Sequence, residues 1–159
     1  MAAAKTLHYK RSHFATQLPL AYLYTPSHAW LAPAPAAAKE RSWRVGLTKF
    51  ATRMLGEMVD HGFELEPGAN VDCGSILGWV EGFKAISDLF CVAEGKFAGR
   101  NPALQENISL ITKSPYNTGW LYEIDGKPDS KCLDVHAYRD LLDKTIDRIL
   151  AQQKGEEIK

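Results

Sequence analysis

The chain has 159 residues, which is enough for one domain to bury a hydrophobic core without disulfides or a structural metal. Its 19 Lys and Arg residues equal its 19 Asp and Glu residues, so no net charge attracts nucleic acid or an anionic membrane. Three cysteines without a Cys-x-x-Cys pair argue against a disulfide framework and a zinc site, and no apolar run is long enough to cross a membrane. We therefore expect a protein of a reducing compartment, either the cytoplasm or, in a eukaryote, the mitochondrial matrix.

Residues 1–21 form an N-terminal extension with no clear hydrophobic period. The first acidic residue of the chain is Glu40, and a start without acidic residues can be a mitochondrial transit peptide. Pro19 would interrupt the amphipathic helix of such a peptide, which favours the alternative of an extension in a bacterial protein. We expect this extension to be an arm packed on the domain or a partly disordered segment.

Residues 22–47 contain two predicted strands joined by a long loop. The first strand covers residues 28–31, after an interruption at Pro26. The Ala- and Pro-rich stretch 32–38 has the composition of a linker, but a strand-like segment follows it, so we expect an extended hairpin loop rather than a domain boundary. Residues 43–47 place Trp, Val and Leu on one face, as in a strand.

A short helix and a third strand come next. Thr48 is a suitable N-cap for a helix over residues 49–55, which Gly56 would end. We expect residues 58–65 to form the strand that follows this helix.

The most informative stretch covers residues 76–92. A two-residue period over residues 76–82 predicts a strand, and a second apolar run begins at Ile86 after a connection of hairpin length. Lys84 would then lie on the turn, with its side chain in water on a rigid base. This is the placement that an enzyme needs if it is to acylate an amine, although an ordinary solvated turn residue would look the same.

The end of the chain contains a strand and a helix. Residues 119–124 predict a strand, which the turn residues 125–128 would end. Asp134 is a suitable N-cap for the clearest helix of the chain, whose apolar side chains recur at three- and four-residue steps at Ala137, Tyr138, Leu141, Leu142, Ile146, Ile149 and Leu150. Six or seven short strands followed by one helix predict a mainly β fold.

Glu81 lies three residues before Lys84, and Ala85-Ile86-Ser87-Asp88 follows it. This run resembles the lipoyl-attachment segment of the glycine cleavage system H protein family, in which a glutamate precedes the modified lysine and Ala-x-Ser-Asp follows. Over residues 22–150 further segments match the family's pattern in the same order: Tyr24-Thr25-Pro26-Ser27-His28-x-Trp30-Leu31, Val45-Gly46-Leu47-Thr48, Leu55-Gly56-Glu57, Val71-x-x-Gly74, Gly95, Asn101-x-x-Leu104 and Pro115-Tyr116-x-x-Gly119-Trp120-Leu121.

The resemblance implies a lipoyl/biotinyl-domain-like fold, a flattened barrel-sandwich hybrid. This domain would cover residues 22–153, with its C-terminal helix from about residue 134 and a polar tail over residues 154–159. Between Glu57 and Gly68 the chain has one residue more than the family's pattern. A β-bulge at Gly62 would absorb it.

The resemblance also implies a non-catalytic carrier whose swinging arm is lipoate in amide linkage to Lys84. In glycine cleavage, this arm would shuttle an aminomethyl group between glycine decarboxylase, aminomethyltransferase and dihydrolipoyl dehydrogenase. A lipoate ligase or lipoyltransferase would recognise Glu81, Asp88 and the hairpin. Ser27, His28 and Asp88 match positions that recognise or contact the arm.

Two positions depart from the family's pattern. Ala29 stands where the family has a glutamate, and Met54 stands where a polar residue precedes Leu-Gly. Each charged hydrogen bond to an amine cargo contributes roughly 1.5 to 3 kcal/mol, so the loss of the carboxylate would weaken cargo retention unless Glu94, Asp60 or another acid substitutes for it. An alternative is therefore an H-protein-like lipoate-binding protein of a sulfur-oxidation pathway. A further alternative is an unmodified binding module, because Gly82-Phe83 replaces a smaller pair before the lysine and would weaken recognition by the ligase.

Enzyme motifs are scarce in this sequence. The five histidines form no i, i+4 metal pair, and neither Gly-x-Ser-x-Gly nor a phosphate-binding loop occurs. Asp60 and His61 are adjacent in a predicted strand and would point to opposite faces, so they suit a solvated edge rather than a catalytic pair. We expect no catalytic residue and no metal ligand.

Overall fold

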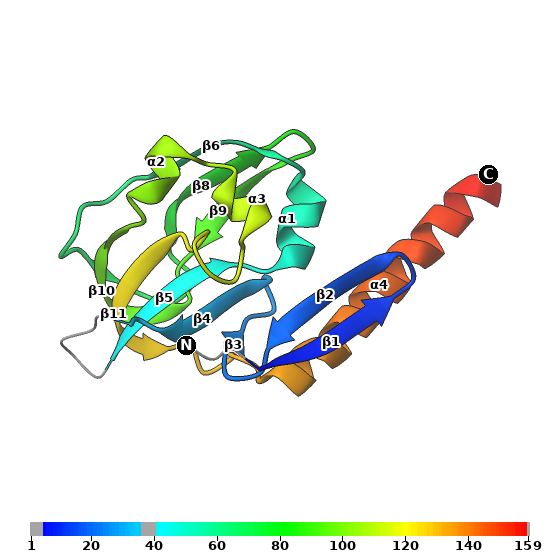
Figure 1. The fold of residues 1–159 in the computed structure, drawn as a ribbon, viewed down its shortest axis with the longest axis horizontal. Helices are drawn as coiled ribbons and strands as arrows, with labels where there is room; N and C mark the ends of the chain where they lie inside the picture. Colours follow the sequence, from blue (N-terminus) through cyan, green and yellow to red (C-terminus); the bar gives the residue numbers. More distant parts are fainter. Residues whose placement is uncertain (1–4, 36–40, 159) are drawn as a thin grey trace.

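The computed structural model describes residues 5–35 and 41–158, which contain eleven strands and four helices (Figure 1). The strands are β1 (Thr6–Arg11), β2 (Phe14–Pro19), β3 (Leu23–Tyr24), β4 (Ala29–Pro33), β5 (Ser42–Leu47), β6 (Met58–Phe63), β7 (Asn70–Val71), β8 (Ile76–Gly82), β9 (Ile86–Phe90), β10 (Ala93–Arg100) and β11 (Tyr122–Pro128). The helices are α1 (Lys49–Leu55), α2 (Ala103–Glu106), α3 (Leu110–Lys113) and α4 (Val135–Ile158). The predicted mainly β fold with a C-terminal helix is confirmed.

Two antiparallel sheets enclose the main hydrophobic core. One has the strand order β3-β4-β5-β11-β10-β7 and the other the order β6-β8-β9. Their inward side chains form one buried cluster, which includes Leu31, Val45, Leu77, Val80, Phe97 and Ile124. Because both sheets contribute to this cluster, the β8–β9 hairpin stands on a packed base.

A second hydrophobic cluster joins the two ends of the chain. The antiparallel pair β1–β2 lies along α4, and α4 extends beyond it, away from the sheets (Figure 1). Buried aromatic and aliphatic side chains from β1, β2, α1 and α4 meet here, among them Tyr9, Phe14, Leu18, Phe50, Tyr138, Leu142 and Ile146.

The β1–β2 hairpin lies within residues 1–21, where the sequence predicted no strand. The pairing of β1 with β2 runs in continuous register from Thr6 opposite Pro19 to Arg11 opposite Phe14. Ser12 in the connecting turn has a φ of 56°. Gly, Asn and Asp usually signal such turns, and their absence from this one hid the hairpin in the sequence.

Two other predictions about the strands were wrong in detail. The irregularity in β6 lies between Met58 and Asp60 instead of at Gly62, so the extra residue is the exposed Val59. The segment 125–128 does not end a strand, because β11 continues to Pro128 by pairing with the first residues of β10. Long-range pairing overrides turn composition at this point.

Local signals were otherwise reliable. The side chain of Thr48 accepts a hydrogen bond from the Ala51 N–H at the start of α1, and Gly56 ends this helix with a φ of 80°. Asp134 Oδ1 accepts from the Ala137 N–H, and α4 continues to Ile158 through the predicted polar tail. The antiparallel β4–β5 pair agrees with a hairpin loop over residues 32–38, although residues 36–40 lie outside the described part. Within residues 5–35 and 41–158, no helix has both the length and the apolar character that crossing a membrane requires.

Candidate functional site

Lys84 lies at the tip of the β8–β9 hairpin. Glu81 pairs with Ile86 at the end of the ladder, and the Gly82 N–H donates to the Ala85 carbonyl at 2.9 Å. Phe83, Lys84 and Ala85 are all exposed. The amine of Lys84 is therefore accessible to an enzyme in solution.

The segment between α1 and β6 braces this tip. The Lys84 N–H donates to the Leu55 carbonyl at 2.9 Å, and the Phe83 N–H donates to the Glu57 carbonyl at 3.0 Å. The chains approach so closely that a Cβ on Gly82 would lie 2.1 Å from the Leu55 oxygen. These contacts hold the backbone beneath Lys84, so the tip is a rigid post.

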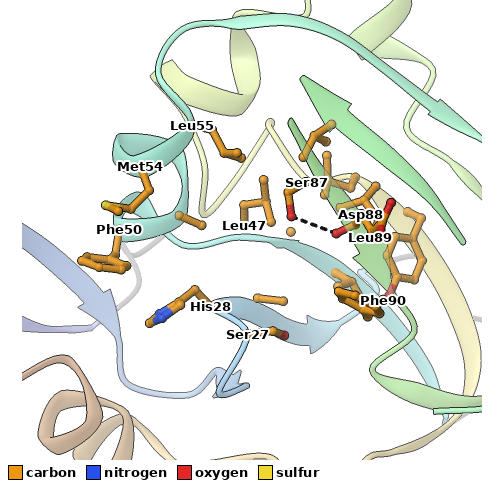
Figure 2. A pocket seen from close by; sticks show the side chains of 17 residues that line it. Ser27, His28, Leu47, Phe50, Met54, Leu55, Ser87, Asp88, Leu89 and Phe90 are labelled. Atoms are coloured by element: carbon orange, nitrogen blue, oxygen red, sulfur yellow. Dashed lines mark hydrogen bonds between the residues drawn. The ribbon is translucent and has the colours of Figure 1, made fainter. Parts of the chain in front are cut away.

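A pocket of about 210 Å³ lies between α1 and β9, over β4 and β5. Figure 2 shows Phe50 and Met54 of α1 on one side and Ser87, Asp88, Leu89 and Phe90 of β9 on the other, with Ser27 and His28 beneath. Most of the lining side chains are apolar, including Ala29, Val45, Leu47, Ala51, Leu55, Val80 and Leu121. The pocket therefore suits an uncharged, largely aliphatic group.

The polar groups of the pocket are few. Asp88 supplies the one carboxylate among the lining residues, and Asp88 is exposed. Ser87 Oγ donates to the Asp88 carbonyl at 3.0 Å, and Ser27 Oγ lies 2.9 Å from Thr25 Oγ1. The side chain of Ala29 is buried in the wall, so no acid lies at that position.

His28 is a neutral support in the wall. Its Nδ1 lies 2.8 Å from the Tyr138 hydroxyl, whose oxygen is 2.9 Å from Thr48 Oγ1. Burial lowers the pKa of His28 to about 4, so the ring is uncharged at neutral pH. The residue also has a φ of 68°, in the left-handed region that few side chains adopt.

The five residues singled out in the sequence fall into two groups. Ser27, His28 and Asp88 line the pocket, whereas Lys84 and Glu81 belong to the hairpin and do not line it. Glu81 is half-buried and lies opposite Ile86 on one side and Asp60 on the other. In the described part of the chain, no group of three His, Cys, Asp or Glu residues is placed to hold a metal ion.

Several residues of this region were missed in the sequence. Phe50 and Phe90 line the pocket, and the hydroxyl of Tyr138, a residue of α4, forms a hydrogen bond with His28. Phe83 and Ile86, on either side of Lys84, are 78% and 67% exposed. Phe83 was noted in the sequence only as part of a larger pair before the lysine, and nothing in the sequence distinguished Phe50 or Tyr138 from ordinary core residues.

Residues 22–145 match the family model described as glycine cleavage H-protein. The chain belongs to this family. The glycine cleavage system H proteins of Corynebacterium jeikeium and Bacteroides fragilis are each 35% identical to it, over 78% and 73% of this chain and 96% and 90% of theirs. The crystal structure of a glycine cleavage system H protein from Mycobacterium marinum superposes with a TM-score of 0.67 at 34% identity, covering 76% of this chain and 95% of that one.

Membership of the H-protein family agrees with the predicted barrel-sandwich fold. The match begins at residue 22 and ends at residue 145, so β1, β2 and the last part of α4 lie outside it. The contact of Phe14 on β2 with the lining residue Phe50 therefore comes from a segment outside the matched range.

Acid should destabilise this H-protein family member through His28. The unfolded pKa near 6.5 exceeds the folded value of about 4, so the unfolded state binds more protons between these values. Stability should be fully present above pH 6.5, fall as the pH decreases toward 4, and lose at most about 3 kcal/mol from this group. Urea unfolding at pH 7 and pH 4.5, followed by circular dichroism, measures the difference.

His28→Asn is the matched control, because asparagine tolerates the left-handed backbone and does not titrate. Its stability should depend less on pH than that of the wild type. A weaker dependence should remain, since burial also lowers the pKa of His61. An undiminished dependence in the variant would exclude His28 as the main acid-sensitive group.

Proposed function

We propose that this chain is a non-catalytic lipoyl carrier, with lipoate joined by an amide to Nζ of Lys84. The arm would shuttle the aminomethyl group of glycine cleavage between partner enzymes. The observation that carries the proposal is the exposed Lys84 on a braced tip, close to a pocket with apolar walls. Membership of the H-protein family, which carries lipoate, supports the same assignment.

The residues of the chain suit this group. A free lysine amine has a pKa near 10.4 and is cationic at neutral pH, whereas the amide is uncharged. A neutral aliphatic arm then matches walls built from side chains such as Leu47, Val80 and Leu89. When bound, lipoate supplies a disulfide that can be reduced, loaded and reoxidised.

The hairpin contributes position rather than chemistry. Hydrogen bonds from Phe83 and Lys84 to the α1–β6 segment fix the point from which the arm would swing. Tethering makes each delivery effectively intramolecular, with local concentrations on the order of millimolar. Because the anchor is rigid, the arm would reach each partner enzyme from the same fixed point, and the high local concentration would apply to every delivery.

The exposed surface around the tip is where we place the partners. A lipoate ligase or lipoyltransferase would contact the hairpin at Glu81 and Asp88, with Phe83 and Ile86 on either side of the acceptor lysine. Glycine decarboxylase, aminomethyltransferase and dihydrolipoyl dehydrogenase would then receive the arm in the glycine cleavage reaction. All of them would approach the same accessible tip.

The apolar pocket also favours a second candidate function. With Ala29 in the wall and Asp88 as the one lining carboxylate, the pocket offers little to hold a cationic amine. A lipoate-binding protein of a sulfur-oxidation pathway, whose cargo is not an amine, would use the same arm and pocket. An unmodified binding module of this fold would use the pocket without an arm.

Intact mass spectrometry after incubation with lipoate, ATP and a lipoate ligase tests the proposal. The wild type should gain one lipoyl group, and Lys84→Arg should gain none. Lys96→Arg is the matched control, because Lys96 is an exposed lysine on β10, and it should be modified like the wild type. Absence of an adduct with several ligases would support the binding module, and an adduct in Lys84→Arg would refute the assignment of the lysine.

A further inference from the structure

The N-terminal strands β1 and β2, outside the family match, are held against α4, whose first part lies inside that match. Arg11 Nε and Nη2 each lie 2.8 Å from a carboxylate oxygen of Asp147, which makes a bidentate pair between β1 and α4. The Tyr9 hydroxyl donates to Asp143 Oδ1 at 2.8 Å. Figure 1 shows β1 and β2 along α4, and we call these three elements the terminal clasp.

The clasp also packs on α1, the helix that forms one wall of the pocket. The ring of Phe14 on β2 meets the ring of Phe50 edge to face, with centroids 5.6 Å apart. Lys49 Nζ donates to the Ala15 carbonyl at 2.9 Å. Phe50 lines the pocket and lies 4.6 Å from the ring of His28, so a single side chain separates the clasp from the pocket.

A second route runs from α4 to the same wall. The buried Tyr138 hydroxyl contacts both His28 Nδ1 and Thr48 Oγ1, at 2.8 and 2.9 Å. Thr48 is the N-cap of α1, and His28 is part of the pocket lining. The clasp therefore supports both the beginning of the helix and the side chain beneath it.

This support matters because α1 has only seven residues. Isolated helices of that length are not stable in water, so the wall depends on tertiary packing. Met54, near the end of the helix, is 49% exposed and gives little packing of its own. The contacts with Phe14, Ala15 and Tyr138 add to the packing of Leu55 in the main core and help to hold this wall.

We infer that the terminal clasp positions α1 as the wall of the pocket and thereby sets how firmly the pocket holds the arm on Lys84. Phe14 and Tyr138 are the positioning residues. The statement about the arm rests on the proposed function, whereas the statement about the wall does not. The clasp gives a role to residues 5–21, most of which lie on β1 and β2.

Two variants test the inference. Phe14→Ala removes the contact with Phe50, and Tyr138→Phe keeps the aromatic ring but removes the hydroxyl that contacts His28 and Thr48. Val71→Ala is the control, because it removes buried apolar surface from the other core cluster and does not line the pocket. Hydrogen exchange of residues 49–55 in the unmodified proteins should be faster by roughly tenfold in both test variants than in the control.

The second readout uses the lipoylated proteins and follows reduction of the dithiolane by a water-soluble phosphine. Reduction should be faster in Phe14→Ala and Tyr138→Phe than in the wild type and in Val71→Ala. Exchange in α1 no faster than in the control would overturn the inference, and so would faster exchange with unchanged reduction of the arm. If Phe14→Ala does not fold, the milder Tyr138→Phe decides. A wild type that accepts no lipoate would refute the proposed function alone, because the exchange measurement needs no arm.

Discussion

Gly78→Ala should weaken the base of the β8–β9 hairpin and slow lipoylation of Lys84 by at least about tenfold, because the acceptor lysine would lose its fixed position. Gly78 lies in the middle of the β6-β8-β9 sheet, opposite Phe63 on one side and Leu89 on the other. A Cβ at this position would lie 1.9 Å from the Gly62 carbonyl oxygen and 2.9 Å from the Phe63 Cα. Both obstacles are backbone, so the strands must separate.

The cost in the free energy of unfolding should be about 1 to 3 kcal/mol, as for other substitutions that overfill a packed interior. Urea unfolding measures this loss, and the initial rate of adduct formation in intact mass spectra measures lipoylation. Gly155→Ala is the control, because the added Cβ would meet nothing within 4 Å beyond its chain neighbours and its own helix backbone, and α4 should tolerate alanine. If the Gly78→Ala protein is destabilised but is lipoylated at the same rate as the wild type, the ligase does not need the intact hairpin.

Ala29→Glu should make this protein retain an amine cargo at least about tenfold longer. The substitution places a carboxylate in the wall of the pocket. The carboxylate of Asp88 is the only other one among the lining residues. A charged hydrogen bond to a cationic amine contributes roughly 1.5 to 3 kcal/mol, and each 1.4 kcal/mol corresponds to a factor of ten. The unloaded protein should become less stable by about 1 to 3 kcal/mol, because Ala29 is only 8% exposed and the new side chain is polar.

The measurement follows decay of the loaded arm by intact mass, after loading of the lipoylated protein with an aminomethyl group. Ala29→Gln is the matched control, since it has nearly the same volume without the charge and should retain the cargo like the wild type. Equally long lifetimes in Ala29→Glu and the wild type, both well above that of the aminomethylated arm free in solution, would show that the native pocket already holds the amine. That result would favour glycine cleavage over the sulfur-oxidation alternative.

The hairpin under Lys84 shows what local sequence can predict. A two-residue period, a short connection and a second apolar run were sufficient to place Lys84 on a turn, and β8 and β9 bound that turn as expected. The helix over residues 49–55 was predicted equally well. Its cap and its final glycine act within a few residues of their own positions.

Predictions that depended on pairing partners were less reliable. The segment 125–128 has the composition of a turn, yet it is a strand because β10 pairs with it. The bulge in β6 lies at Val59 rather than at Gly62, because register is set by the neighbouring strand. A single strand's composition does not contain this information.

The sequence by itself determined the mainly β fold class, the family and the exposed lysine, because strand period, turn chemistry and spaced motifs are local properties of the chain. Only the tertiary structure decided the pocket and the terminal clasp. The contact between His28 and Tyr138 joins residues 110 positions apart, and that between Arg11 and Asp147 joins residues 136 positions apart. Such contacts follow from the complementary shapes and charges of surfaces whose residues lie far apart in the chain, and no local pattern records them.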